Sequence, residues 1–277
     1  MRILGVDFTS RPTRRKPITV AVCELTDACL RFSRLGNLTD FAAFESQLSL
    51  VGPWAAAMDF PFGQSARFLD NIGWPYDWPD YVEHVSRMDR RAFRKCLDDY
   101  RQPRPAGDKE HQRASDQLTG AISPQKLYGV PVGLMFFAGA KRLLKSGVTI
   151  AGLYAGDKQR VVFEAYPGVL ARRATPSGYK SDDRAKQTAA HQKARDAILD
   201  FVLNGGVTRD YGLTVDVPSA HASRMRADPT GDELDALLCA VQATWAWRAW
   251  PRLKNHISDI QRREGWIADP MIFPALH

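Results

Sequence analysis

The sequence predicts an α/β protein with one mixed sheet, on three observations. Short apolar runs rich in β-branched residues occur early in the chain and again near residue 160. Longer stretches with helical spacing follow them, and the order of strands and helices favours a single sheet covered by helices. Apolar residues make up 44% and charged residues 25% of the 277 residues, which is typical of a globular protein. We therefore expect one domain over residues 1–277.

Five strands are predicted from these apolar runs. The run 18–25 is rich in β-branched residues, and the short step around Asp27 fits a hairpin to the next run. The fourth run, which ends at Asp59, is short and fully apolar. The predicted strands cover residues 3–8, 18–25, 28–35, 54–59 and 160–164.

Residues 64–147 predict a helical insertion into this sheet protein. The segment is rich in Asp, Arg, Pro and aromatic residues. Apolar residues recur at helical spacing over 81–100, and a second, apolar helix is predicted over 134–145. Outside the insertion, helices are predicted from residue 39 or 40 to 50, after Pro167, from 181 or 182 to 202, and from 230 or 232 to 250.

Acidic residues stand where apolar runs end. Asp7, Asp59 and Glu164 each close a predicted strand, and Asp232 and Asp235 open the last major helix, where their spacing puts them on one face. A carboxylate at the exit of a buried strand is unfavourable unless it is paired or binds a metal. Carboxylates gathered from several elements typically hold Mg²⁺ or Mn²⁺. We therefore expect a metal site made of Asp7, Asp59, Asp232 and Asp235.

Each acid also has an ordinary explanation. Asp7 could cap a turn, Asp59 could simply end its strand, and Asp232 could cap its helix. For any one of them this explanation is the better one. For all of them together it requires several coincidences, so the set favours a functional site.

The chain resembles a known family in short motifs that occur in the same order along it. The motifs are residues 5–10, 59–63, 163–167, 231–236 and 264–267. They are similar to those of domain-of-unknown-function family 429, a group of predicted nucleases with the RNase H-like fold of the RuvC-like resolvases. The resemblance implies a mixed five-stranded sheet flanked by helices, and metal-dependent hydrolysis of phosphodiester bonds.

The resemblance also implies roles for single residues. The acid of the first strand would be Asp7, that of the fourth strand Asp59, and those of the final helix Asp232 and Asp235. Glu164 would be a further catalytic ligand or would orient Lys180. One departure is that Phe-Pro-Phe follows Asp59, which puts two aromatic residues near the metals. This suits a small or flipped-out substrate as much as a duplex.

Four basic residues are candidates for binding a phosphate group. Lys180 and Lys186 follow the strand that ends at Glu164, although a solvated helix start explains them equally well. Arg113 and Lys126 lie in a long polar stretch of the insertion, and such stretches often form lids or binding loops.

The remaining composition limits the class of protein. The net charge of +7 permits a nucleic-acid partner without proving one. The four cysteines have no zinc-ligand spacing, so we expect reduced thiols in a cytoplasmic protein. No apolar run approaches the length of a membrane span, and the chain enters a strand without a signal peptide, so we expect no membrane association.

These observations predict a divalent-metal-dependent nuclease or phosphodiester hydrolase that uses Mg²⁺ or Mn²⁺. One alternative is a non-catalytic nucleic-acid- or protein-binding module on the same fold. The other is an ATP-dependent phosphotransferase of the actin and sugar-kinase type, which also begins with an acid-bearing strand. The sequence lacks the Gly-rich phosphate loops of that group, so we rank it lower.

Overall fold

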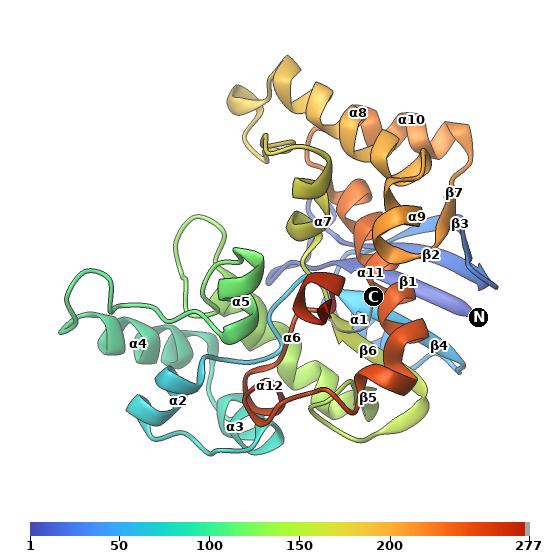
Figure 1. The fold of residues 1–277 in the computed structure, drawn as a ribbon. Coiled ribbons are helices and arrows are strands. Elements are labelled where there is room, and N and C mark those ends of the chain that lie inside the picture. The colour runs from blue at the N-terminus through green and yellow to red at the C-terminus, as the bar shows by residue number, and fades with distance from the viewer. Residues whose placement is uncertain (275–277) are drawn as a thin grey trace.

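The computed structural model describes residues 1–274 and is built around a seven-stranded mixed sheet (Figure 1). The strands lie in the order β5-β6-β4-β1-β2-β3-β7. They are β1 (Arg2–Asp7), β2 (Ile18–Thr26), β3 (Cys29–Leu38), β4 (Trp54–Met58), β5 (Val148–Ile150), β6 (Asp157–Glu164) and β7 (Thr214–Asp216).

The strand count corrects the sequence prediction of five. The two additional strands, β5 and β7, have three residues each and lie at the two edges of the sheet. Runs this short show neither alternation nor a sustained apolar pattern, so periodicity does not reveal them. The five predicted strands correspond to β1, β2, β3, β4 and the second half of β6.

Parallel pairing brings the ends of three central strands to one edge of the sheet. β4 lies parallel to both β1 and β6, and in the paired register Met58 is opposite both Val6 and Glu164. The amide of Asp59 donates a hydrogen bond to the carbonyl of Val6 at 2.9 Å. Because the registers match, Asp7 and Asp59, each one residue beyond this level, leave the sheet together, while Glu164 lies at the level of Met58.

Helices cover both faces of the sheet, and each face has its own core. One face packs against α11, whose neighbours come from the second half of the chain. These helices are α7 (Pro167–Ala174), α8 (Ala189–Leu203), α9 (Gly206–Tyr211), α10 (Ser219–Ala227) and α11 (Asp232–Leu253). The other face packs against α1 (Phe41–Leu48) and helices of residues 64–147.

Residues 64–147 contain five helices, and a sixth short helix near the C-terminus packs on them. They are α2 (Ala66–Ile72), α3 (Trp78–Ser86), α4 (Arg90–Arg101), α5 (Ala114–Thr119) and α6 (Val132–Ser146), with α12 (Asp259–Glu264) as the sixth. α6 packs directly on the sheet, so this segment supplies part of the core as well as an overhang. No helix among the described residues is long and apolar enough to cross a membrane.

Two helix predictions differ from the structure. The helix predicted over 81–100 is divided into α3 and α4, because the Asp89 carboxylate caps α4 by accepting a hydrogen bond from the amide of Ala92 at 2.7 Å. The helix predicted to start at Ser181 or Asp182 begins only at Ala189, after the cap Thr188. The loop before α8 is therefore longer than expected, and it carries Lys180.

α11 lies unusually close to β1 because the strand presents a glycine to it. A Cβ added to Gly5 would overlap the carbonyl oxygen of Ala236 and the amide nitrogen of Ala240. Backbone atoms cannot turn away as a side chain can, so the helix could not keep its position. Gly5 thereby sets the distance between the first turn of α11 and the end of β1.

We expect Gly5→Ala to lower the free energy of unfolding by about 3 kcal/mol or more, at the upper end of overpacking effects. Gly36→Ala is the matched control, because a Cβ there would meet its nearest atom at 3.7 Å, an ordinary contact. Thermal melts of the two variants measure the difference. Equal melting temperatures would contradict a close approach of α11 to β1.

Candidate metal centre

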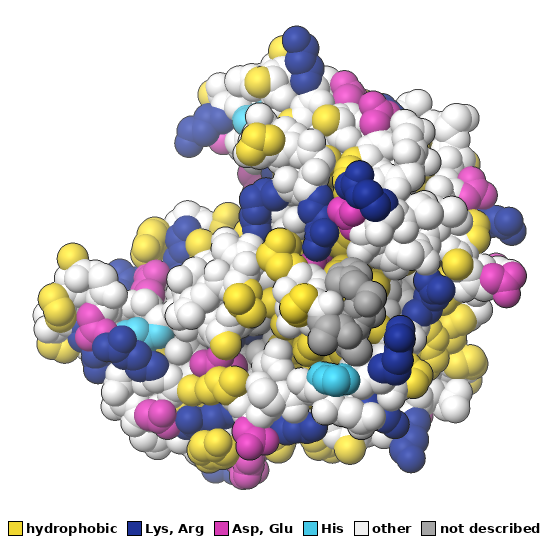
Figure 2. All heavy atoms as spheres, viewed as in Figure 1, with side chains coloured by type: hydrophobic (Ala, Val, Ile, Leu, Met, Phe, Trp, Pro, Cys, Tyr) yellow, Lys and Arg dark blue, Asp and Glu magenta, His cyan; other side chains and the backbone are white. Residues whose placement is uncertain are grey.

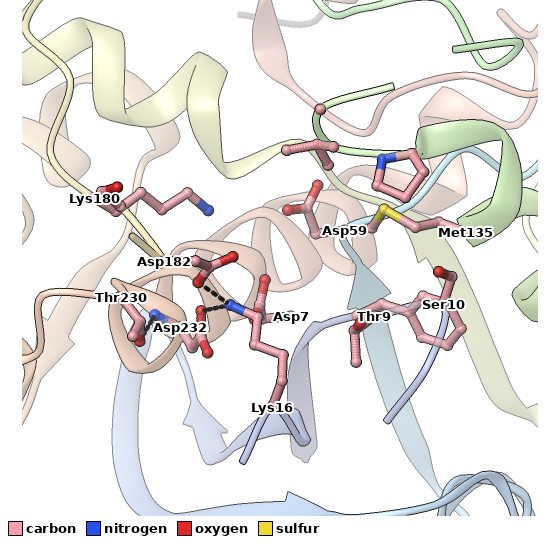
Figure 3. Close-up of a pocket in the computed structure, with 15 residues that line it drawn as sticks. Asp7, Thr9, Ser10, Lys16, Asp59, Met135, Lys180, Asp182, Thr230 and Asp232 are labelled. Atoms are coloured by element: carbon pink, nitrogen blue, oxygen red, sulfur yellow. Dashed lines mark hydrogen bonds and ion pairs between the residues drawn. The ribbon is translucent and has the colours of Figure 1, made fainter. Parts of the chain in front are cut away.

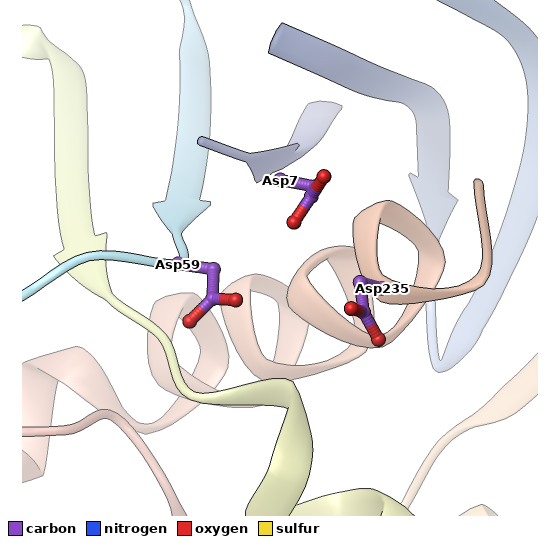
Figure 4. A group of neighbouring side chains, drawn as sticks. All are labelled: Asp7, Asp59 and Asp235. Carbon is purple, nitrogen blue, oxygen red and sulfur yellow. The ribbon is translucent and has the colours of Figure 1, made fainter. Parts of the chain in front are cut away.

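Three carboxylates meet at the sheet edge, and we call them the carboxylate cluster: Asp7, Asp59 and Asp235. Asp7 ends β1, Asp59 follows β4, and Asp235 lies in the first turn of α11 (Figure 4). Each offers one oxygen, and these oxygens lie within 4.8 Å of one another. Three separate elements thus supply oxygen ligands around one point.

Two members of the cluster have no protein partner. Within residues 1–274, no hydrogen bond or ion pair reaches the carboxylate of Asp7 or Asp59, although Asp7 is only 7% exposed. Burial, and to a lesser extent the charge of Asp235, raise the pKa of Asp59 to about 7 against the opposing charge of Lys180. Burial likewise raises the pKa of Asp7 well above its ordinary value. Asp7 is buried, and Asp59 is partly exposed to the cavities that it lines. Acids held in such places without a partner are rare in proteins unless they serve a ligand.

The third member, Asp235, is held by two neighbours from the loop before α8. The hydroxyl of Tyr179 donates to its carboxylate at 2.5 Å, and the Lys180 ammonium forms an ion pair with it. Burial alone would lower the pKa of Lys180, but the charges of Asp235, Asp7 and Asp59 together with Tyr179 outweigh burial and hold that pKa well above its ordinary value. Gly231 allows this contact, since a Cβ there would meet the Cβ of Lys180 at 2.9 Å.

The donor set fits a hard divalent cation. All of its ligand atoms are carboxylate oxygens, which Mg²⁺ and Mn²⁺ prefer over softer donors. The Lys180 side chain extends toward Asp59 (Figure 3), and its ammonium pairs with Asp235, so a positive charge already lies at the cluster. The carboxylate cluster could therefore hold a metal ion once Lys180 leaves Asp235.

Asp232, predicted as a fourth ligand, lies outside this group of three. Its carboxylate accepts a hydrogen bond from the Lys16 ammonium at 2.7 Å, and the same ammonium contacts Asp182 at 2.7 Å (Figure 3). Asp232 lines the same cavity as Asp7 and Asp59, and Lys16 pairs with it there, so its role as a fourth ligand stays a prediction.

Glu164 and Arg113, predicted as a further ligand and as a phosphate binder, pair with each other in the structure. The Arg113 guanidinium donates to Glu164 at 2.8 Å and to Asp116 at 2.7 Å, and only 2% of Arg113 is exposed. Glu164 also accepts from the amide of Phe62 at 2.8 Å. With these partners, Glu164 neither orients Lys180 nor needs a metal, and Arg113 has no free charge for a phosphate group.

The C-terminal motif 264–267 supports this buried pair. The Glu264 carboxylate accepts hydrogen bonds from the amide of Ala66 at 2.7 Å and from that of Ala114 at 2.8 Å, so it holds the starts of α2 and α5. Gly265, with φ of 81°, lies against the Arg113–Glu164 pair. The motif therefore has a structural role, which fixes the insertion to the sheet edge.

The other predicted phosphate binders are placed differently from one another. Lys180 lies in the carboxylate cluster, as described. The Lys186 side chain is 76% exposed, its ammonium lies 3.5 Å from the Asp183 carboxylate, and it lines none of the three cavities at the cluster. The Lys126 ammonium lies 5.1 Å from the centre of the Tyr128 ring, at the edge of the insertion.

Sequence reasoning missed two residues that shape the site. Lys16 lies in the basic loop after β1, where several lysines and arginines offered no means of choosing one. Tyr179 immediately precedes Lys180, and a tyrosine next to a candidate lysine was the available signal. Both contacts depend on loop positions that no periodic pattern specifies.

Three cavities meet at Asp59 and Lys180, which line all of them. The largest, of about 460 Å³, lies between the loop after β1 and the insertion and includes Lys16 and Asp232 (Figure 3). The second, of about 270 Å³, runs along the start of α7, and the third, of about 240 Å³, extends under the insertion. The space-filling view shows a notch between the part that carries α8 and the part that carries α4 and α5 (Figure 2).

Comparisons with models of protein families, with curated proteins and with solved structures found no match to this chain.

The raised pKa of Asp59 makes one contribution to stability depend on pH. Between its ordinary pKa of 3.8 and about 7, the folded state keeps a proton that the unfolded state has lost, so stability falls as pH rises and levels above about 7. Asp59→Asn removes this penalty. In EDTA, we expect Asp59→Asn to raise the melting temperature more at about pH 8 than at about pH 4.5. The two increases should differ by on the order of 5 °C. Asp80→Asn, at an exposed position on α3, controls for surface charge, and equal gains at both pH values would contradict the burial of an uncompensated acid.

Lys180 should compete with metal for Asp235. We expect Lys180→Met to tighten Mn²⁺ binding about five- to tenfold in calorimetric titration, because the metal no longer displaces an ammonium. Without metal, the same variant should be less stable, since Asp235 loses its partner. Lys186→Met, which removes an exposed lysine of the same loop, should change neither quantity. Weaker Mn²⁺ binding by Lys180→Met would show that Lys180 does not exchange with a metal.

Proposed function

We propose that this protein is a divalent-metal-dependent nuclease with an RNase H-like fold, which hydrolyses phosphodiester bonds at the carboxylate cluster. The observation that carries the proposal is the pair of acids that have no partner within residues 1–274, Asp7 and Asp59, next to Asp235. An acid-bearing first strand, a β1–β2–β3 meander and a closing helix that bears acids support the RNase H-like part of it. The resemblance of the sequence motifs to a family of predicted nucleases points the same way.

In this proposal each residue of the cluster has a distinct task. Asp7 and Asp59 hold the cation from the sheet side, and Asp235 holds it from α11. Bound Mg²⁺ or Mn²⁺ would make a water molecule more acidic and would neutralise charge on the phosphate. Lys180, once it leaves Asp235, remains at the junction of the three cavities and balances the charge of an entering phosphate.

Nucleic acid is the proposed partner because its backbone is anionic and the chain is basic. Lys16 and Lys180 both line the largest cavity, where a backbone could pass the carboxylate cluster. The net charge of +7 favours association with a polyanion, in a manner that should weaken with salt.

Cleavage assays test the proposal. With Mn²⁺ or Mg²⁺, we expect cleavage of at least one member of a panel of single-stranded, duplex, hybrid and branched substrates. Asp7→Asn and Asp59→Asn should each reduce the rate by about 100-fold or more, because each removes a metal ligand. Asp232→Asn should cost less than about tenfold, because Lys16 already balances that acid.

The same assay separates the alternatives. A non-catalytic binding module would bind nucleic acid in a salt-dependent way without metal affinity or turnover. A phosphotransferase would bind ATP in calorimetry. Cleavage that persists at full rate in both Asp7→Asn and Asp59→Asn would contradict the nuclease proposal.

A further inference from the structure

The third cavity at the cluster differs from the other two in its walls. We call it the insertion-side cavity; its volume is about 240 Å³. Most of its lining is apolar and comes from the segment after β4, from the insertion and from the C-terminal segment. The apolar wall consists of Phe60, Pro61, Ile122, Val130, Val132, Met135 and Ile267. A ligand that enters it must present apolar faces.

Polar atoms line one part of this cavity, and they are fixed in place. Arg113, Asp116 and Glu164 line it, and they are tied to one another by the buried ion pairs described above. A carboxylate has about four acceptor positions, and each of these two carboxylates already accepts three hydrogen bonds, so about one position on each remains for a ligand. The cavity therefore offers apolar walls and hydrogen-bond acceptors along one part, which suits a flat group with apolar faces and N–H donors at its edge.

The insertion-side cavity lies directly beside the carboxylate cluster, so a flat group in it would lie next to a phosphate at the cluster. Asp59 belongs to both the carboxylate cluster and the insertion-side cavity, and Lys180 lines the cavity as well. A phosphate held at the cluster would thus have its neighbouring nucleotide at the mouth of the cavity. A nucleobase has the apolar faces and the polar edge that the walls select.

Exposed apolar and basic side chains of the insertion lie near this cavity. Ile122, Tyr128 and Val130 are 41%, 57% and 59% exposed. The Lys126 ammonium and the Arg101 guanidinium lie 5.1 and 5.5 Å from the centre of the Tyr128 ring. The Tyr128 hydroxyl and Arg101 also contact Glu110, at 3.3 and 3.6 Å. One exposed ring next to basic groups is an arrangement that occurs on surfaces that bind single strands, where bases stack and phosphates pair with cations.

We propose that the insertion-side cavity receives one unpaired nucleobase next to the scissile phosphate, so that the substrate is single-stranded or locally unpaired nucleic acid. The proposal rests on the proposed function only in placing the phosphate at the carboxylate cluster. A base inside a duplex cannot enter, because it must first leave the stack.

Binding without turnover tests this directly. Fluorescence anisotropy in EDTA and low salt compares labelled DNA and RNA single strands of about twelve nucleotides with the DNA duplex of the same sequence. We expect the better single strand to bind at least about tenfold more tightly than the duplex. Ile122→Trp, which fills the mouth of the cavity, should weaken single-strand binding about tenfold, the effect of losing one base contact.

Leu118→Trp is the matched control. Leu118 is 61% exposed in α5 and does not line the cavity, so this variant should bind within about twofold of the unchanged protein. Val130→Trp, at a second exposed position of the wall, should repeat the loss seen in Ile122→Trp, and thermal melts establish that each variant is folded. Duplex binding as tight as single-strand binding, no binding by any of the oligonucleotides, or equal effects of Ile122→Trp and Leu118→Trp would overturn the proposal.

Failure of this inference and failure of the proposed function give different results. Single-strand binding that Ile122→Trp weakens, without cleavage of any substrate in Mn²⁺, supports the cavity and contradicts the nuclease. Cleavage of duplex at a rate unchanged in Ile122→Trp contradicts the cavity and supports the nuclease.

Discussion

The close packing of α11 on β1 is the constraint on which the candidate site depends. Gly5 presents no side chain to the helix, so the backbone at Ala236 and Ala240 lies directly against the strand. Asp7 is two residues beyond Gly5 along β1, and Asp235 immediately precedes Ala236. The same contact that closes the core therefore brings two acids from distant parts of the chain together. The packing of α11 on β1 stabilises the core, but it also holds like charges close together at the sheet edge, which is electrostatically unfavourable.

A second buried interaction positions the insertion relative to that edge. Arg113 pairs with Glu164 at the end of β6, and Glu264 holds the starts of α2 and α5 from the other side. An isolated charge in this place would be strongly unfavourable, so Arg113 and its two partner acids, Glu164 and Asp116, depend on one another. Their pairing fixes the wall of the insertion-side cavity next to Asp59. The insertion thus shapes access to the carboxylate cluster without supplying a member of it.

The sequence predicted those features that a local pattern encodes. The runs that end at Asp7 and Asp59 are short, apolar and β-branched or small, and parallel strands must end at one edge, so the meeting of these acids followed from the pattern. The helix that carries Asp235 was visible in its spacing and start. The strands β5 and β7 were missed because three residues carry no period.

Local sequence patterns could not predict which basic residue pairs with each acid. Glu164 and Asp232 stand in the same kind of sequence as Asp59 and Asp235, yet Arg113 neutralises the first and Lys16 the second. Arg113 precedes Glu164 by 51 positions, and Lys16 precedes Asp232 by 216. Which acid remains without a partner depends on these long-range contacts, and they exist only in the folded chain.

The most direct measurement is a crystal structure of the protein soaked in Mn²⁺, with the metal located by its anomalous scattering. The account predicts a peak bonded to oxygens of Asp7, Asp59 and Asp235, with the Lys180 ammonium displaced from Asp235 and the Arg113–Glu164 pair unchanged. A cluster without a peak in which Lys180 still pairs with Asp235, or a peak bonded to Glu164, would contradict it.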